Sequence, residues 1–276
     1  MDEKADDLTQ QRVTYAVTDG VADVRFVRAD KMNALDDAMF DAIIETGKKL
    51  KDDSSVRVVV LSGEGRAFCA GLDFGRFGDM AAGTAKPRDL SAPERIGPAK
   101  AKGQQAPYVW IDLPVPVIAA VHGFAFGGGL QIALAADIRI ATPDAKLSVM
   151  EMKWGLIPDM TGSQLLPELV GRDVAKELTY TGRIIGGEEA NEIGLVTRLS
   201  DDPRKAALEL AAEIANKSPQ AIRYAKQLLE MAGRVSIEEG FAAEQTAIRD
   251  LIGSPNQVEA VAANLEKRAP KFADFS

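Results

Sequence analysis

The 276-residue sequence contains a single cysteine, Cys69, and a single histidine, His122. One cysteine excludes a disulfide within the chain and is typical of a reducing compartment, so we expect a cytoplasmic protein. Any nucleophile–histidine pair would have to use His122, for which we favour a structural role at the entrance to a loop. Cys69 lies between Phe68 and Ala70, which favours a small packed side chain over a nucleophile.

Long apolar runs and an excess of positive charge are also missing. No uninterrupted apolar run is long enough to cross a membrane, and residues 1–11 lack the apolar core of a signal peptide. Lysine and arginine number 33 against 41 aspartates and glutamates, which gives a formal net charge of -8. We therefore expect neither nucleic acid nor a membrane as a partner, although a local basic patch could still hold a phosphate.

The sequence does contain a clear order of strand-like and helix-like stretches. Apolar residues make up 46%, enough for a large core. Strands are expected at 13–17 and 21–27, joined by a turn at Asp19-Gly20, and at 56–61, 115–121, 137–141, 146–149 and 195–199. Helices are expected at 36–51, 161–181 and 187–193, and from Asp202 onward the pattern is helical only. This order predicts a disordered N-terminus over 1–11, an α/β core over 12–200 and a helical region over 201–276.

Residues 75–107 differ from the rest of the predicted core. They are rich in glycine, proline and charge and hold few large apolar residues, with a short helix expected just before Pro114. Such a composition is typical of a mobile loop over a binding site. We therefore predict a lid-like segment here.

Three consecutive glycines, Gly127 to Gly129, lie between the strand at 115–121 and an alanine-rich, helix-like run. Backbone without side chains lets a ligand approach closely, and the first turn of a helix has unpaired N–H groups. These groups suit an oxygen that carries or develops negative charge. The alternative is that the glycines serve only to pack a helix tightly against a strand.

A second glycine-bearing loop, residues 66–73, directly follows the strand expected at 56–61. In open α/β sheets, ligands bind beyond the carboxyl ends of the strands. One backbone N–H from each of the two loops could therefore converge on a single carbonyl oxygen. The alternative for this loop is an ordinary strand-to-helix turn.

The two loops together resemble the crotonase family, the enoyl-CoA hydratase/isomerase superfamily. The resemblance rests on FCAGLD at 68–73, on HG at 122–123 with GGG at 127–129, and on EMKWGLIP at 151–158, and it extends from about Val13 to the C-terminus. It implies an α/β fold, a crotonase-like spiral of ββα units with a C-terminal all-helical trimerisation region. It also implies an acyl-CoA thioester substrate and a homotrimer or a dimer of trimers. Coenzyme A would be part of the substrate, and no further cofactor or metal is expected.

The resemblance assigns roles to particular residues. The N–H groups of Leu72 and Gly128 would form an oxyanion hole for the thioester carbonyl. Donors aimed at that oxygen stabilise the enolate formed when a neighbouring carbon loses a proton. The residues expected to bind the CoA ester lie in the two loops, in a third loop and near the C-terminus: Lys31, Met32, Ala34, Leu35, Ala70, Gly71, Asp73, Gly127 and Lys271.

The acid and base residues decide the reaction. Hydratases of this family use two glutamates, and Glu151 matches one of them. Gln131 stands at the position of the other, and an amide cannot exchange a proton as a carboxylate does. Asp159 resembles an aspartate of the dienoyl-CoA isomerase branch, but it could equally cap a helix that starts near Thr161.

One carboxylate is enough to move a double bond, because it can take a proton from one carbon and return it to another. We therefore predict an enoyl-CoA isomerase with Glu151 as base and acid. The alternative is an enoyl-CoA hydratase in which Glu151 acts with Gln131 and Asp159. Another thioester reaction, such as hydrolysis or decarboxylation, and a non-catalytic member of the superfamily remain open.

Overall fold

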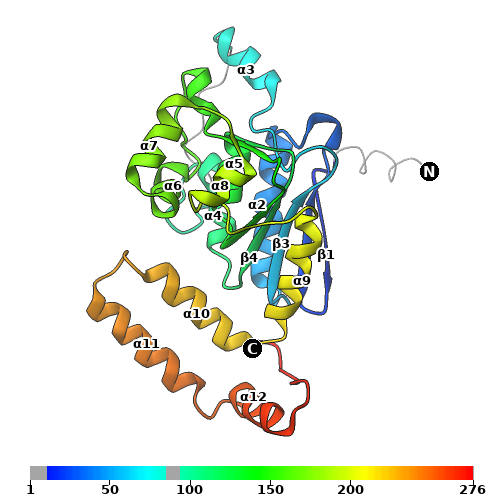
Figure 1. Ribbon diagram of the computed structural model, residues 1–276, viewed down its shortest axis with the longest axis vertical. Coiled ribbons are helices and arrows are strands. Elements are labelled where there is room, and N and C mark those ends of the chain that lie inside the picture. The colour runs from blue at the N-terminus through cyan, green and yellow to red at the C-terminus, as the bar shows by residue number, and fades with distance from the viewer. Residues whose placement is uncertain (1–10, 85–93, 276) are drawn as a thin grey trace, which may run out of the picture.

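The computed structural model describes residues 11–84 and 94–275 (Figure 1). Most of the predicted disordered N-terminus and the middle of the predicted lid-like segment lie outside the described residues. The described rest of that segment includes all of α3 (Phe74–Ala81) but its first residue and the first part of α4 (Lys102–Ile111). Helix α3 was not expected, and it begins where the Asp73 carboxylate accepts the N–H of Gly75. Among the described residues, no helix has the length and apolar character needed to cross a membrane.

The main sheet has six strands in the order β1-β2-β3-β4-β6-β9. They are β1 (Val13–Thr18), β2 (Val21–Phe26), β3 (Val58–Gly63), β4 (Val117–Val121), β6 (Ile138–Ala141) and β9 (Arg198–Leu199). The first two strands are antiparallel and the other neighbours are parallel. Asp19 and Gly20 both have positive φ, 50° and 79°, as a two-residue hairpin turn requires. The predicted hairpin is confirmed, and each strand predicted from the sequence overlaps a strand of the structure.

A smaller sheet continues from the end of β4. Its strands, in the order β5-β7-β8, are β5 (Phe124–Phe126), β7 (Lys146–Ser148) and β8 (Ile185–Gly186). Only His122 and Gly123 separate β4 from β5, and Cys69 forms an isolated parallel bridge with Ala125. The loop after β3 is therefore tied by backbone pairing to the chain that follows β4.

Helices cover both faces of the main sheet (Figure 1). The larger core includes side chains of α2 (Asp37–Asp52), α4, α5 (Gly128–Leu134), α6 (Gly162–Val170), α7 (Arg172–Thr181) and α8 (Gly187–Glu192). Asp36 accepts the N–H of Met39 and so caps α2, as predicted. Because strand side chains alternate between faces, Val59 points into this core while Val58 and Val60 point to the opposite face.

The opposite face is covered by α9 (Pro203–Ala215). Its alanines at 207, 211 and 215 pack against Val58, Val60 and Ile118. The sequence pattern assigned α9 to the helical region beyond residue 200, whereas in the structure it completes the sandwich around the sheet. Small side chains at a spacing of four let this helix lie close to the strands.

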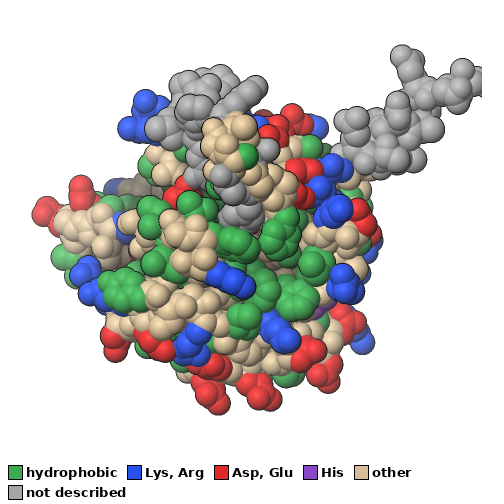
Figure 2. Space-filling model, turned by 90° about the horizontal axis from the view of Figure 1, so that it is seen from above, with side chains coloured by type: hydrophobic (Ala, Val, Ile, Leu, Met, Phe, Trp, Pro, Cys, Tyr) green, Lys and Arg blue, Asp and Glu red, His purple; other side chains and the backbone are tan. Residues whose placement is uncertain are grey.

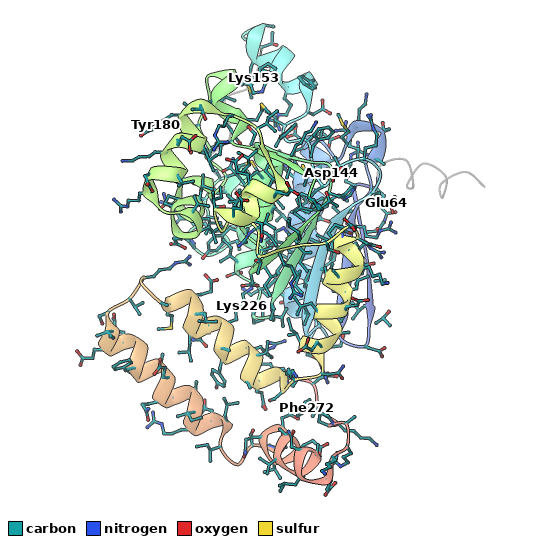
Figure 3. All side chains as sticks on the ribbon, in the orientation of Figure 1. Glu64, Asp144, Lys153, Tyr180, Lys226 and Phe272 are labelled. Carbon is teal, nitrogen blue, oxygen red and sulfur yellow. The ribbon has the colours of Figure 1, made fainter. Side chains whose placement is uncertain are left out.

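The remaining helices form an arm that extends away from the core, at the bottom of Figure 1: α10 (Pro219–Met231), α11 (Ile237–Leu251) and α12 (Pro255–Glu266). Lys226 of α10, labelled in Figure 3, ties the arm to the core, because its Nζ lies 2.9 Å from both the Val115 carbonyl and the Asp137 Oδ2. Large apolar side chains on the arm are exposed, namely Leu229, Ile237, Phe241, Ile252 and Leu265.

Candidate active site

Leu72 and Gly128, whose backbone amides are the predicted oxyanion donors, border one cavity. Leu35 pairs with the loop after β3, donating its N–H to the Gly71 carbonyl (2.8 Å) and accepting that of Asp73 (3.1 Å). In such a parallel bridge the N–H of Leu72 points away from Leu35. Gly128 is the first residue of α5, so its N–H has no acceptor within the helix. Within the described parts of the chain, neither amide donates to a protein acceptor.

The two loops touch where the oxyanion hole is predicted. A Cβ added to Gly71 would lie 3.7 Å from the nitrogen of Gly128, and one added to Gly129 would lie 2.2 Å from the Cys69 carbonyl oxygen. Phe126 donates its N–H to that same carbonyl at 3.1 Å. Gly129 therefore allows close packing, while Gly128 borders the cavity and its N–H has no acceptor among the described residues.

Glu151 lies beside these amides, in the 3₁₀ helix η2 (Met150–Trp154) that follows β7. Its Oε1 accepts a hydrogen bond from Gln131 Nε2 at 2.6 Å. Its Oε2 is buried and has no hydrogen-bond partner among the described residues. Burial raises the pKa of Glu151 to about 7, against the opposing effect of the Gln131 hydrogen bond and with a contribution from the charge of Asp159. Near neutral pH this carboxyl group is therefore able to take up and release a proton.

Gln131, in α5, is held from two sides. Its Oε1 accepts the backbone N–H groups of Met160 (2.8 Å) and Gly162 (2.9 Å), while its Nε2 donates to Glu151. Two backbone donors define the oxygen end of the amide, so the NH₂ group has to face the carboxylate. Gln131 thereby orients Glu151 and satisfies the first N–H of α6, where Thr161 provides no side-chain cap.

Asp159 borders the same cavity as Glu151. The helix that it could have capped, α6, begins at Gly162, whose N–H donates to Gln131. The negative charge of Asp159 also contributes to the raised pKa of Glu151. Asp159 therefore lies where it can influence chemistry in the cavity.

The cavity has a volume of about 680 Å³ and is largely apolar. Seen from above in Figure 2, apolar side chains gather in the middle of this face, with lysine and arginine side chains beside them. Of the residues predicted to bind the CoA ester, five border the cavity: Met32, Leu35, Ala70, Gly71 and Gly127.

The other four predicted CoA contacts, Lys31, Ala34, Asp73 and Lys271, are not among the residues that border the cavity. Asp73 binds Arg28 at 2.6 Å as well as capping α3, and the Ala34 carbonyl accepts Arg28 Nη1 at 2.9 Å. Lys31 is exposed at the end of η1 (Ala29–Lys31). Lys271 follows α12, next to Phe272, which Figure 3 places at the opposite end of the molecule from Lys153. Within one chain, Lys271 is therefore remote from the cavity that Lys153 borders.

The single cysteine and the single histidine contact backbone carbonyls. Cys69 is fully buried and its Sγ donates to the Asn33 carbonyl at 3.1 Å, while burial raises the pKa of its thiol to about 12. The Nε2 of His122 lies 3.0 Å from the Gly65 carbonyl. The packed role predicted for Cys69 is confirmed, and the contact of His122 agrees with its predicted place in a loop.

The sequence patterns gave no role to Asn33, Phe74 and Trp154. Asn33 is fully buried and donates from Nδ2 to the carbonyls of Glu64 (3.0 Å) and Ala67 (2.8 Å), which holds the loop after β3. Phe74 and Trp154 border the cavity and contact each other. The only available signal was that Phe74 follows the FCAGLD motif and that Trp154 lies inside the EMKW motif.

The chain is similar in sequence and in structure to known proteins. The family model described as Enoyl-CoA hydratase/isomerase matches residues 16–275. The chain is 35% identical to enoyl-CoA hydratase domain-containing protein 2 of Mus musculus, over 92% of this chain and 84% of the relative. It is 33% identical to methylglutaconyl-CoA hydratase of Mus musculus, over 92% and 79%. A solved enoyl-CoA hydratase of Bacillus anthracis is 32% identical, with a TM-score of 0.84 over 95% of this chain and 99% of that one.

Proposed function

The chain belongs to the enoyl-CoA hydratase/isomerase family, and on that premise we propose that it is an enoyl-CoA isomerase, which moves a double bond in an acyl-CoA thioester. The observation that carries this proposal is the pairing at Glu151. One carboxylate has a buried oxygen that finds no partner in the described parts of the chain, and the residue at the second acid position, Gln131, is an amide held by two backbone N–H groups. A single carboxylate with a pKa near 7 suits a reaction that removes a proton and returns it.

In the proposed reaction, the thioester oxygen accepts hydrogen bonds from the N–H groups of Leu72 and Gly128. Glu151 takes a proton from the α-carbon of a 3-enoyl-CoA, and the electron pair moves into a dienolate whose charge collects on that oxygen. The protonated Glu151 then returns the proton to the γ-carbon, which leaves a 2-enoyl-CoA. Each oxyanion donor typically contributes about 3 kcal/mol to stabilising such a state.

Gln131 is a positioning residue in this proposal. Its amide keeps Glu151 Oε1 occupied, which leaves Oε2 as the oxygen that meets the substrate. Because its own oxygen is bound by Met160 and Gly162, it cannot turn to offer that oxygen to an attacking water.

Enoyl-CoA hydratase is the second candidate, and two observations favour it. Asp159 borders the same cavity and could act as the second acid that hydration needs. Relatives with about a third identity are named as hydratases, methylglutaconyl-CoA hydratase among them.

The two functions are separated by supplying purified protein with a 3-enoyl-CoA and, separately, a 2-enoyl-CoA. Isomerisation leaves the mass unchanged and shifts the chromatographic position, whereas hydration adds the mass of one water. We expect rapid conversion of the 3-enoyl ester and slow water addition to the 2-enoyl ester. Fast water addition without double-bond migration would make hydration the function.

We also propose that the arm joins this chain to further copies of itself, as a trimer or a dimer of trimers. The exposed apolar side chains of α10 to α12 would be costly to leave in water, and a second copy of this chain would cover them. Lys271 lies at the end of this arm, so any contact with CoA phosphates would be to a neighbouring subunit's substrate. Light scattering at several concentrations tests the assembly, and a stable monomer would contradict it.

A further inference from the structure

We infer that Phe74 and Trp154 form an aromatic clamp over the acyl chain, and that the substrate carries a neutral, apolar acyl group extending beyond its reacting carbons. The inference rests on the proposed acyl-CoA function of the cavity. It assigns a specificity role to two residues that take no part in the proton transfer.

The clamp joins the two elements that hold the proposed chemistry. Phe74 is the first residue of α3, two positions after Leu72, and Trp154 is the last residue of η2, three positions after Glu151. Side chains three apart in a 3₁₀ helix are eclipsed, so Trp154 shares a face of η2 with Glu151. The rings of Phe74 and Trp154 meet edge to face, with centroids 5.9 Å apart and planes at 79°. An acyl chain that runs from the space between Leu72 and Glu151 along the side of the cavity bordered by Phe74 and Trp154 would pass beside the paired rings.

The clamp is exposed to an unusual degree. Phe74 is 72% exposed and Trp154 is 41% exposed, and Ile157, which borders the same cavity, is 69% exposed. Aromatic side chains bring a large apolar area, and leaving it in water forgoes the stabilisation that burial gives. An apolar acyl chain lying in the cavity would cover this surface.

The charges around the cavity favour a neutral acyl group. Glu151 and Asp159 both border the cavity and would repel a carboxylate at the far end of the acyl group. The cationic residues that border it, Arg66 and Lys153, are exposed, and the Lys153 ammonium lies 5.8 Å from the Trp154 ring centroid. Because solvent screens the exposed cations more than the partly buried carboxylates, the charges that border the cavity favour a neutral acyl group.

Binding of saturated acyl-CoA esters tests the inference without any turnover. Calorimetric titration compares acetyl-CoA, octanoyl-CoA and glutaryl-CoA, which differ in the length and charge of the acyl group. Because each buried methylene strengthens binding, we expect octanoyl-CoA to bind at least about tenfold more tightly than acetyl-CoA. Glutaryl-CoA should bind no more tightly than acetyl-CoA.

Variants then assign this preference to the clamp. Phe74→Ala and Trp154→Ala should each lose most of the preference for octanoyl-CoA while binding acetyl-CoA as the parent does, and Phe74→Leu should keep it. Tyr180→Ala is the matched control, because Tyr180 is a 68% exposed aromatic residue of α7 that does not border the cavity (Figure 3). Tryptophan fluorescence adds a direct readout: octanoyl-CoA should shift the emission of Trp154, and this shift should vanish in Trp154→Phe, where only the fully buried Trp110 remains.

The outcomes separate this inference from the proposed function. Equal affinity for acetyl-CoA and octanoyl-CoA, tightest binding of glutaryl-CoA, or clamp variants that behave like Tyr180→Ala would each overturn the clamp and leave an acyl-CoA site in place. If none of the CoA esters bound, the proposed function and the clamp would fall together.

Discussion

Glu151 and Lys226 are both ionisable side chains with atoms shielded from water, yet their surroundings differ. Lys226 Nζ lies within hydrogen-bond distance of three oxygens, the carbonyls of Trp110 (3.4 Å) and Val115 (2.9 Å) and the carboxylate of Asp137 (2.9 Å). Glu151 has one oxygen bound by Gln131 and one buried oxygen without a partner among the described residues. A fully satisfied buried charge holds parts of a fold together, whereas a half-satisfied one is available for chemistry. This contrast predicts that mutations at the two places act on different properties.

The largest effect is expected from Glu151→Gln. The variant keeps the shape of the side chain but removes the group that takes and returns the proton, so kcat should fall by about 10³-fold. Octanoyl-CoA binding should be retained, because the clamp and the oxyanion amides are untouched, and the melting temperature at neutral pH should not fall, because the variant removes a buried carboxylate whose ionisation is unfavourable. Steady-state kinetics and calorimetric binding measure both properties, and retained turnover would mean that Glu151 is not the base.

Lys226→Met should act on stability instead. It removes the ammonium between α10 and the core, so the carbonyls of Trp110 and Val115 and the carboxylate of Asp137 lose this donor. Asp137 Oδ2 still accepts the Val117 N–H at 2.6 Å. Because Asp137 is partly exposed, we expect a loss of about 2 kcal/mol in the free energy of unfolding, below the range for a fully buried pair. Urea unfolding measures this loss, and kcat per folded molecule should stay unchanged. A variant with lost kcat and normal stability would contradict the contrast.

The pH dependence should report Glu151. Its pKa is raised to about 7, so the base form of the free enzyme is lost as the pH falls through that value. The ratio kcat/KM should therefore fall about tenfold per pH unit below pH 6.5. The free energy of unfolding should change with pH in the opposite direction to kcat/KM. Because the folded state holds the Glu151 proton more tightly than the unfolded state, wild type should lose stability relative to Glu151→Gln as the pH rises from 4.5 through 7. A flat rate profile between pH 5.5 and about 8 would contradict the assignment.

Gln131→Glu should give the smallest but most diagnostic change. A carboxylate at this position can still accept the N–H groups of Met160 and Gly162, and it supplies the second acid that hydration uses. We expect the ratio of hydrated to isomerised product to rise severalfold. Gln131→Met is the matched control, because it keeps the length of the side chain without an acid. An unchanged product ratio in Gln131→Glu would show that residue 131 does not decide between the two reactions.

Much of the fold followed from local sequence signals. The hairpin at Asp19-Gly20, the β-branched strand expected at 56–61 and the cap at Asp36 each depend on neighbouring residues. The structure has the hairpin and the cap, and it has the strand as β3, two residues further along the chain. Helix α9 was placed outside the core because an all-helical stretch does not reveal its packing partner. Its alanines at a spacing of four were the available hint.

The candidate site was harder to predict, because its contacts join residues far apart in the chain. The triple glycine and the loop at 66–73 indicated two converging backbone amides, and the family resemblance singled out Glu151. Two contacts of the site depend on how α3, α5, α6 and η2 pack together. They are the hydrogen bonds from Met160 and Gly162 to Gln131 and the ring contact between Phe74 and Trp154. No local pattern carries that information.

The most direct test of the account is a crystal structure of Glu151→Gln with a 3-enoyl-CoA bound. We predict that the thioester oxygen lies about 3 Å from the backbone nitrogens of both Leu72 and Gly128, with side chain 151 beside the α- and γ-carbons. A thioester oxygen that contacts neither amide, or an acyl chain that lies away from residue 151, would contradict the account.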